Sequence, residues 1–203
     1  MSLWAIVPVK PLRRGKSRLA RVLTEEERTL LNYSMLGNTL KTLASVPEVD
    51  QVLVISRDTS ALALARDMGA RTLQEDGSSD LNTALRRATV VAQFYVAQSV
   101  LVLPADLPLI TKESLQNFIH AAGKPPVVAF CPDRRMDGTN ALYISPPGLI
   151  DYQFGPGSFW QHVREAENYR VRVEVCHLPE ISLDLDLPED LELLQQMKVD
   201  VGV

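Results

Sequence analysis

Short apolar runs alternate with helix-forming segments through the first two thirds of the chain, and this alternation limits the possible folds. Continuous apolar runs occur at 3–9, 52–55 and 99–103, and a segment with helical spacing follows each of them. Strands whose apolar residues are continuous rather than alternating are usually buried on both faces. The pattern therefore predicts an α/β fold in which a mostly parallel sheet has helices on both sides.

The remaining elements follow from capping signals and apolar spacing. Thr24 and Glu27 have the spacing of a capping box, which predicts a long helix from there to about Ser45. The less regular later region predicts strands at 127–131, 141–144 and 171–176, including antiparallel ones. We find no repeat, low-complexity tract or linker, and therefore expect residues 1–203 to form a single domain. A brief strand is expected at 71–73, and further helices at 61–68, 81–98, 111–122, 159–168 and 188–197.

Composition excludes some classes of protein. The chain has 203 residues, 46% of them hydrophobic, which is enough for one well-covered core. A net charge of −4 argues against a general nucleic-acid binder, which needs a basic face. The two cysteines, Cys131 and Cys176, read as reduced thiols. The chain starts without a signal-peptide pattern, and its apolar stretches are too short to span a membrane, so we expect a cytosolic protein.

Basic side chains crowd the segment directly after the first apolar run, with no acid among them. Such a loop offers the cations and backbone N–H groups that a triphosphate needs. It lacks the spacing of a Walker P-loop, and a merely solvated basic loop is the alternative. We expect it to bind a small polyanion. The basic residues are Lys10, Arg13, Arg14, Lys16, Arg18 and Arg21.

Three carboxylates follow or end predicted strands. Asp106 comes just after the apolar run that ends at Leu103, and Asp184 and Asp186 alternate with leucines. In an extended strand residues i and i+2 share a face, so these two carboxylates point the same way while the leucines face the core. Paired carboxylates favour a bound cation, and their oxygens suit Mg²⁺ or Mn²⁺. We interpret them as a metal site, with a turn aspartate and two surface acids as the alternative.

Further polar segments are candidates for contacts to a substrate. Thr139 and Asn140 offer short donors at the start of a predicted strand. Gly155 and Ser158 flank a helix start, whose N–H groups bind carboxylates or phosphates; an ordinary helix cap is the alternative. The polar loop at 74–80 leads into a helix and could close over a base or ribose. His120, His162 and His177 have no recognisable partner spacing, and we assign them no chemistry.

Together these segments resemble one family across nearly the whole chain: the guanylyltransferases that act on 2-phospho-L-lactate or phosphoenolpyruvate in the biosynthesis of coenzyme F-420 (CofC/FbiD type). Each motif alone is weak, and their order and spacing make the set specific. The motif at 105–109 also occurs in nucleotidyltransferases of the molybdopterin type. The motifs are VPVK at 7–10, GKSRL at 15–19, LNTAL at 81–85, ADLPL at 105–109, GTNAL at 138–142, FG at 154–155 with SF at 158–159, and DLDLPEDL at 184–191.

The resemblance implies a three-layer fold of the nucleotide-diphospho-sugar-transferase-like (GT-A) type with a mixed, mostly parallel sheet. It implies Mg²⁺ held by Asp106, Asp184 and Asp186. It also implies that Thr139, Gly155 and Ser158 contact the acceptor, and we add the neighbouring Asn140. We expect Lys16, Arg18 and Asp106 to be catalytic. The expected nucleotide contacts are Pro8, Lys10, Lys16, Ser17, Arg18, Leu81 and Asn82.

The expected reaction moves GMP from GTP to the phosphate of 2-phospho-L-lactate, phosphoenolpyruvate or 3-phosphoglycerate and releases pyrophosphate. Alternatives within enzymes are a cytidylyl- or molybdopterin-type nucleotidyltransferase and a GT-A glycosyltransferase. A catalytically silent GTP-binding module is the alternative from another class. The sequence is compatible with a homodimer and does not give the oligomeric state.

Overall fold

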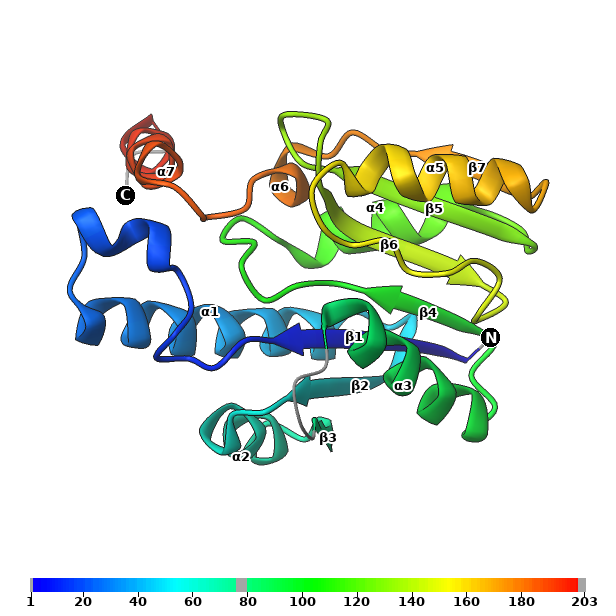
Figure 1. The fold of residues 1–203 in the computed structure, drawn as a ribbon, viewed down its shortest axis with the longest axis horizontal. Helices are drawn as coiled ribbons and strands as arrows, with labels where there is room; N and C mark the ends of the chain where they lie inside the picture. Colours follow the sequence, from blue (N-terminus) through cyan, green and yellow to red (C-terminus); the bar gives the residue numbers. More distant parts are fainter. Residues whose placement is uncertain (1, 76–79, 201–203) are drawn as a thin grey trace.

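One sheet of seven strands forms the centre of the molecule, in the order β3-β2-β1-β4-β6-β5-β7 (Figure 1). The computed structural model describes residues 2–75 and 80–200. Most of the polar loop expected to close over a base, residues 76–79, therefore lies outside the described residues. The strands are β1 (Leu3–Val9), β2 (Val49–Ser56), β3 (Arg71–Gln74), β4 (Ser99–Val102), β5 (Val127–Pro132), β6 (Thr139–Ser145) and β7 (Arg172–Val175).

Strand direction brings separate parts of the chain to one edge of the sheet. Neighbouring strands are parallel except at β6, which runs antiparallel to β4 and β5. This confirms the expectation of a mostly parallel sheet with antiparallel strands in the later region. Because β6 is reversed, its first residue, Thr139, lies at the edge where β1 and β4 end.

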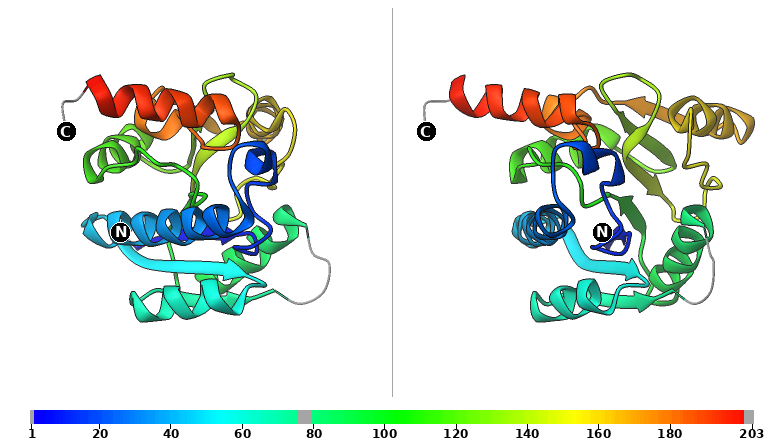
Figure 2. Two further views of the ribbon diagram at one scale, coloured as in Figure 1. Left: turned by 90° about the vertical axis from the view of Figure 1, so that its left-hand side faces the viewer. Right: turned by 60° about the vertical axis from the view of Figure 1, so that its left-hand side comes forward.

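Helices cover both faces of the sheet, as the continuous apolar strands predicted. Along β1, Ala5 and Val7 pack into one core cluster while Trp4 and Ile6 pack into the other. In the right-hand view of Figure 2 the two helical layers lie on either side of the strands. The first layer holds α1 (Glu25–Ser45), α2 (Thr59–Asp67), α4 (Lys112–Ala122) and α6 (Pro179–Ser182), and the second holds α3 (Leu81–Phe94) and α5 (Ser158–Asn168).

Two further helical segments lie beside the edge of the sheet where β1 and β4 end. The loop after β1 leads into a short 3₁₀ helix, η1 (Ser17–Arg21), and the chain ends in α7 (Pro188–Asp200). Leu19 of η1 and Leu194 of α7 belong to one buried cluster, so the first and last parts of the chain pack together (Figure 2). The capping box at the start of α1 is confirmed, since the side chains and backbones of Thr24 and Glu27 bond reciprocally.

The expectation that Asp184 and Asp186 end a strand is wrong. The segment is extended and its alternation is real, because Leu183 and Leu185 are buried while Asp184 and Asp186 are half-buried. It joins no sheet, however, and Leu187 is not buried as the other two leucines are. The backbone N–H of Leu185 donates instead to the carbonyl of a loop residue, Asp106, at 3.0 Å.

The helix expected at 81–98 ends earlier, at Phe94, and Val96 takes a left-handed conformation with φ 61° that turns the chain toward β4. Among the described residues, no helix combines the length and the apolar character needed to cross a membrane. The cytosolic location stays a prediction.

Candidate active site

A cavity of about 520 Å³ opens at the edge of the sheet where β1 and β4 end. Its lining combines cations from the loop after β1 with acids from two distant loops. Phe154 and the start of β6 complete the wall. The residues predicted from the sequence that line it are Pro8, Lys10, Lys16, Leu81, Asp106, Thr139, Asn140, Asp184 and Asp186.

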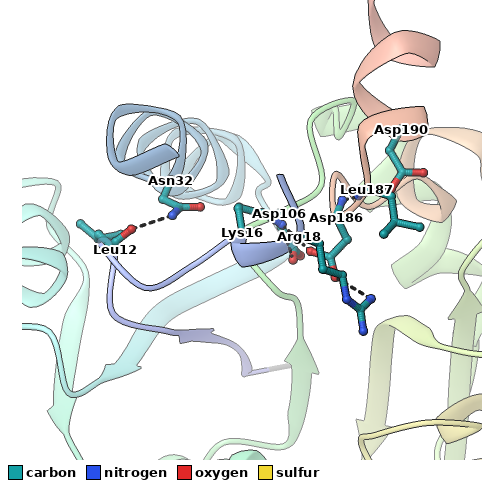
Figure 3. Close-up of polar contacts among 8 residues, drawn as sticks. All are labelled: Leu12, Lys16, Arg18, Asn32, Asp106, Asp186, Leu187 and Asp190. Atoms are coloured by element: carbon teal, nitrogen blue, oxygen red, sulfur yellow. Dashed lines mark hydrogen bonds and ion pairs between the residues drawn. The ribbon is translucent and has the colours of Figure 1, made fainter. Parts of the chain in front are cut away.

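The basic loop after β1 is held by side chains from two other elements. Asn32 of α1 donates from Nδ2 to the carbonyl of Leu12 at 2.7 Å (Figure 3). The N–H of Leu12 donates to Asp58 at 2.7 Å. Gly15 passes so close to α1 that a Cβ there would lie 2.6 Å from the Asn32 amide nitrogen. Lys16 follows with φ 57°, in the left-handed region, immediately before η1.

Lys16 forms the electrostatic centre of the site. Its Nζ donates to Oδ2 of Asp106 and to Oδ1 of Asp186, both at 2.9 Å (Figure 3). Burial alone would lower the pKa of Lys16, but the two carboxylates outweigh it and raise that pKa. Burial likewise opposes ionisation of Asp186, yet Lys16 and the more distant cations hold its pKa below the ordinary value. Arg18, mostly exposed, lies 3.9 Å from the second oxygen of Asp186.

The divalent cation expected at the three carboxylates stays a prediction, and oxygen donors of this kind are those that such an ion takes. Burial raises the pKa of Asp184, and the charges of Asp106 and Asp186 add to the rise, so the three acids interact electrostatically. Within the described residues, no three His, Cys, Asp or Glu side chains lie close enough to enclose a metal ion unaided. Mg²⁺ is commonly bound by one or two carboxylates together with substrate phosphates, and the donors here suit that arrangement.

Asp190 is a site residue that sequence reasoning missed. Its carboxylate is buried and accepts the backbone N–H groups of Asp186 at 3.1 Å and Leu187 at 2.7 Å. Arg134, from the loop between β5 and β6, donates to its other oxygen at 2.9 Å. Asp190 thus fixes the backbone that carries Asp186. An acid in the first turn of a predicted helix was the available signal, because such residues cap the helix start.

The residues expected to contact the acceptor gather around the start of β6. Thr139 Oγ1 lies 3.4 Å from the hydroxyl of Ser158, which is buried at the start of α5. The Asn140 amide donates to the carbonyl of Ile181 at 2.9 Å. Asn140 thereby ties β6 to α6, just before the chain reaches the aspartates.

Several predicted contacts do not line the cavity. Asn82 clamps a neighbouring loop, since its amide donates to the Phe154 carbonyl at 3.0 Å and its oxygen accepts the Phe154 N–H at 2.7 Å. Its direct role toward a nucleotide, like the other assigned ligand contacts, stays a prediction. The predicted residues outside the lining are Ser17, Arg18, Asn82, Gly155 and Ser158.

Sequence reasoning also passed over His162. Its ring is fully buried, and its Nδ1 lies 3.0 Å from the hydroxyl of Thr139. The available signal was helical spacing: Ser158 and His162 are four residues apart in α5, so both face β6.

Comparison with known proteins identifies the family. The family model described as "Guanylyl transferase CofC like" matches residues 3–197. A phosphoenolpyruvate guanylyltransferase of Rubrobacter xylanophilus is 42% identical over 195 residues, covering 96% of this chain and 94% of that protein. A 2-phospho-L-lactate guanylyltransferase of Methanocaldococcus vulcanius is 33% identical over 187 residues, covering 92% of this chain and 81% of that protein.

The fold has a counterpart among solved structures. A protein of Desulfovibrio desulfuricans G20, described as a nucleotide-diphospho-sugar transferase, superposes with a TM-score of 0.79 at 16% identity. The match covers 100% of this chain and 90% of that one. The nucleotide-diphospho-sugar-transferase-like fold expected from the sequence is thereby confirmed, and the full-length match to the family model shows that the chain belongs to the CofC-like guanylyl transferases.

Proposed function

We propose that the protein transfers the guanylyl group of GTP to the phosphate of a small phospho-carboxylate and releases pyrophosphate, as a step of coenzyme F-420 biosynthesis. The acceptor is 2-phospho-L-lactate, phosphoenolpyruvate or 3-phosphoglycerate. The observation that carries the proposal is the contact of Lys16 with Asp106 and Asp186 in a cavity that Thr139 also lines. The names of the relatives support the same chemistry.

The reaction joins two anions, so its main requirement is charge neutralisation and positioning. An oxygen of the acceptor phosphate attacks the α-phosphorus of GTP in line. The new P–O bond forms as the bond to the β-phosphate oxygen breaks, and pyrophosphate leaves with the electron pair. Lys10, Arg14 and Lys16 line the cavity and supply positive charge for the triphosphate. The acceptor phosphate is already ionised at neutral pH, so no strong general base is required.

Asp106, Asp184 and Asp186 would hold Mg²⁺ or Mn²⁺, and such an ion would add positive charge against the phosphate oxygens. The acceptor's other anionic group would meet Thr139 and the start of α5. The nucleotide contacts at Pro8, Ser17, Arg18, Leu81 and Asn82, and the acceptor contacts at Asn140, Gly155 and Ser158, belong to the same proposal.

The decisive experiment supplies purified protein with GTP, Mg²⁺ and each acceptor in turn. We expect pyrophosphate release and, by mass spectrometry, a guanylylated product with at least one of the three acceptors. Asp106→Asn should lower the rate about 100-fold or more, because it removes a charged metal ligand. Asp67→Asn, an exposed carboxylate at the end of α2, is the matched control and should keep the wild-type rate. Absence of product with all three acceptors would contradict the proposal.

A panel of nucleotides separates the alternatives. Product with CTP rather than GTP would indicate a cytidylyltransferase, and product with a molybdopterin acceptor would indicate that class. Turnover of a nucleotide-sugar would indicate a glycosyltransferase. GTP binding without pyrophosphate release would identify a silent nucleotide-binding module.

A further inference from the structure

His162 is a buried histidine that the proposed reaction does not use. Its ring is fully buried in α5, stacked on Phe130 with centroids 6.0 Å apart and edge-on to Phe154 at 4.8 Å. Burial lowers the pKa of His162 to about 4, while a hydrogen bond to the backbone of Ser158 pulls the other way. The imidazole is therefore neutral at neutral pH, and one of its two nitrogens carries the proton.

The surrounding backbone determines which nitrogen that is. The backbone N–H of Gln153 donates to Nε2 of His162 at 2.9 Å. An amide nitrogen only donates, so Nε2 accepts and carries no proton. The proton of the neutral ring is then on Nδ1, which lies 3.0 Å from Oγ1 of Thr139. His162 is consequently a donor toward Thr139, and the backbone of Ser158 is a second acceptor for the same proton.

The donors around Thr139 fix the direction of its own hydroxyl proton. A hydroxyl group has two lone pairs and one proton. One lone pair of Thr139 accepts from His162, and the other faces the hydroxyl of Ser158, which donates at 3.4 Å. What Thr139 has left to offer is its O–H. Thr139 lines the cavity while being only 6% exposed, so we infer that this O–H is offered to a ligand there.

We propose that His162 is a positioning residue: its Nδ1–H holds the Thr139 hydroxyl as a donor for an anionic oxygen of the acceptor, and so favours acceptors that present an oxygen lone pair at that point. This inference rests on the proposed function and extends it. His162 touches neither substrate. It acts through Thr139, by ensuring that the hydroxyl offers a proton and not a lone pair to an incoming anion.

Two substitutions of His162 separate the effects of its hydrogen bonds to Thr139 and to Gln153, because each keeps one bond and removes the other. In His162→Asn the amide nitrogen takes the place of Nδ1 and can still donate to Thr139. In His162→Gln the amide oxygen takes the place of Nε2 and can still accept from Gln153, while the bond to Thr139 is lost. We expect His162→Asn to keep a KM for the acceptor close to wild type and His162→Gln to raise it about tenfold, with the KM for GTP unchanged in both.

The reverse order would overturn the proposal, because it would mean that His162 serves to hold the Gln153 backbone. Equal rises in the KM values for acceptor and GTP would overturn it as well. Thermal unfolding of each variant identifies any that fails to fold. If one fails, the nitrogen NMR measurement on the wild-type protein, described below, tests the proposed position of the ring proton.

A double-mutant cycle tests whether His162 acts through Thr139. Thr139→Val removes the hydroxyl and keeps the shape, and should raise the acceptor KM about tenfold. Adding His162→Gln to Thr139→Val should cause no further rise, whereas additive effects would overturn the proposal. Tyr143→Phe is the matched control. Tyr143 lies toward the far end of the same strand, β6, and the substitution removes its buried hydrogen bond to Ser99 of β4. It should leave the acceptor KM unchanged.

Nitrogen NMR of wild-type protein with ¹⁵N-labelled histidine reads the tautomer without any turnover. We expect one ring with a protonated Nδ1 and a bare Nε2, assigned to His162 by its loss in His162→Asn. A protonated Nε2, or a doubly protonated ring at neutral pH, would overturn the proposal. If wild-type protein gives no guanylylated product, the proposed function fails while the spectrum still decides the orientation of Thr139.

Discussion

Lys16 holds its ammonium group between the carboxylates of Asp106 and Asp186, which need a positive charge beside them whether or not a substrate is bound. Its side chain is 6% exposed and makes charge-assisted bonds to Asp106 and Asp186. Salt therefore screens these two ion pairs less than it screens exposed ones. A lysine ammonium is a compact charge on a flexible stem and can turn from a carboxylate to a phosphate without a change of fold. Lys16 can therefore neutralise the acids before the nucleotide arrives and the triphosphate afterwards.

Lys16→Met should raise the KM for GTP about tenfold or more and change the KM for the acceptor much less, because in the proposed mechanism the lost charge faces the triphosphate. Steady-state kinetics with each substrate varied in turn measures both values. Lys41→Met, an exposed lysine on α1, is the control and should change neither. Unchanged GTP dependence in Lys16→Met would remove the basic loop from the proposed mechanism.

The same substitution should tighten the binding of Mn²⁺ to the nucleotide-free protein. Wild-type Lys16 competes with any cation for Asp106 and Asp186, and methionine leaves both carboxylates unneutralised. Titration of Mn²⁺ followed by electron paramagnetic resonance gives the affinity without catalysis. Weaker binding in Lys16→Met would show that the carboxylates do not share a cation site with this ammonium.

From the sequence we expected the basic loop and Asp106 to converge on one edge of the sheet, because both follow predicted strands whose ends meet there, and Lys16 contacts Asp106 at that edge. Asp190 and His162 could not be assigned in this way. Their partners are backbone N–H groups of Leu187 and of Gln153, which sequence periodicity does not reveal. Side chains whose partners are backbone groups are therefore the part of the site that required coordinates.

At the scale of elements, apolar runs predicted strands well where the runs were continuous. β1 and β4 appear near the expected positions because burial on both faces is a property of the residues themselves. The strand expected at Asp184 and Asp186 was wrong because alternation reports which side chains are buried and not what the backbone bonds to. An extended segment docked onto a loop gives the same alternation as an edge strand.

The start of α7 provides the sharpest test at this scale. Asp190→Asn should lower the free energy of unfolding by about 1–3 kcal/mol, since it weakens a buried acceptor of two N–H groups and the pair with Arg134. Activity should fall as well, because the backbone of Asp186 is no longer fixed. Urea denaturation and initial rates measure the two effects.

A matched control for this prediction is available at the opposite edge of the sheet. The Asp50 carboxylate accepts the N–H of Leu3 at 2.8 Å, at the start of β1. Asp50→Asn should lower stability and keep the wild-type KM values. Unchanged stability and activity in Asp190→Asn would show that α7 does not position Asp186.

On the scale of the whole molecule, the cavity needs nearly the complete chain, because its lining runs from Pro8 to Asp186. The site also gathers like charges. Asp184 has a raised pKa, so the folded state holds its proton more tightly than the unfolded chain does. The stabilising effect of that proton is present at low pH and is lost as the pH rises through the folded-state pKa. At neutral pH the ionised Asp184 therefore costs stability.

Asp184→Asn should thus raise the free energy of unfolding at pH 7, while lowering activity through loss of a ligand to the proposed metal ion. The gain should shrink as the pH falls toward the ordinary range of an aspartate, because a protonated Asp184 has no charge to relieve. Urea denaturation at several pH values measures it. A gain that grew at low pH would contradict the raised pKa.

The backbone bond from Leu185 to Asp106 has an evolutionary consequence. Together with the Asp190 carboxylate, which holds the Asp186 backbone, it sets the gap between Asp106 and Asp186 without help from the side chains around Thr139. Diversification of the pocket around Thr139 can then proceed on an unchanged catalytic frame, in keeping with relatives of one family that bear the names of two different acceptors.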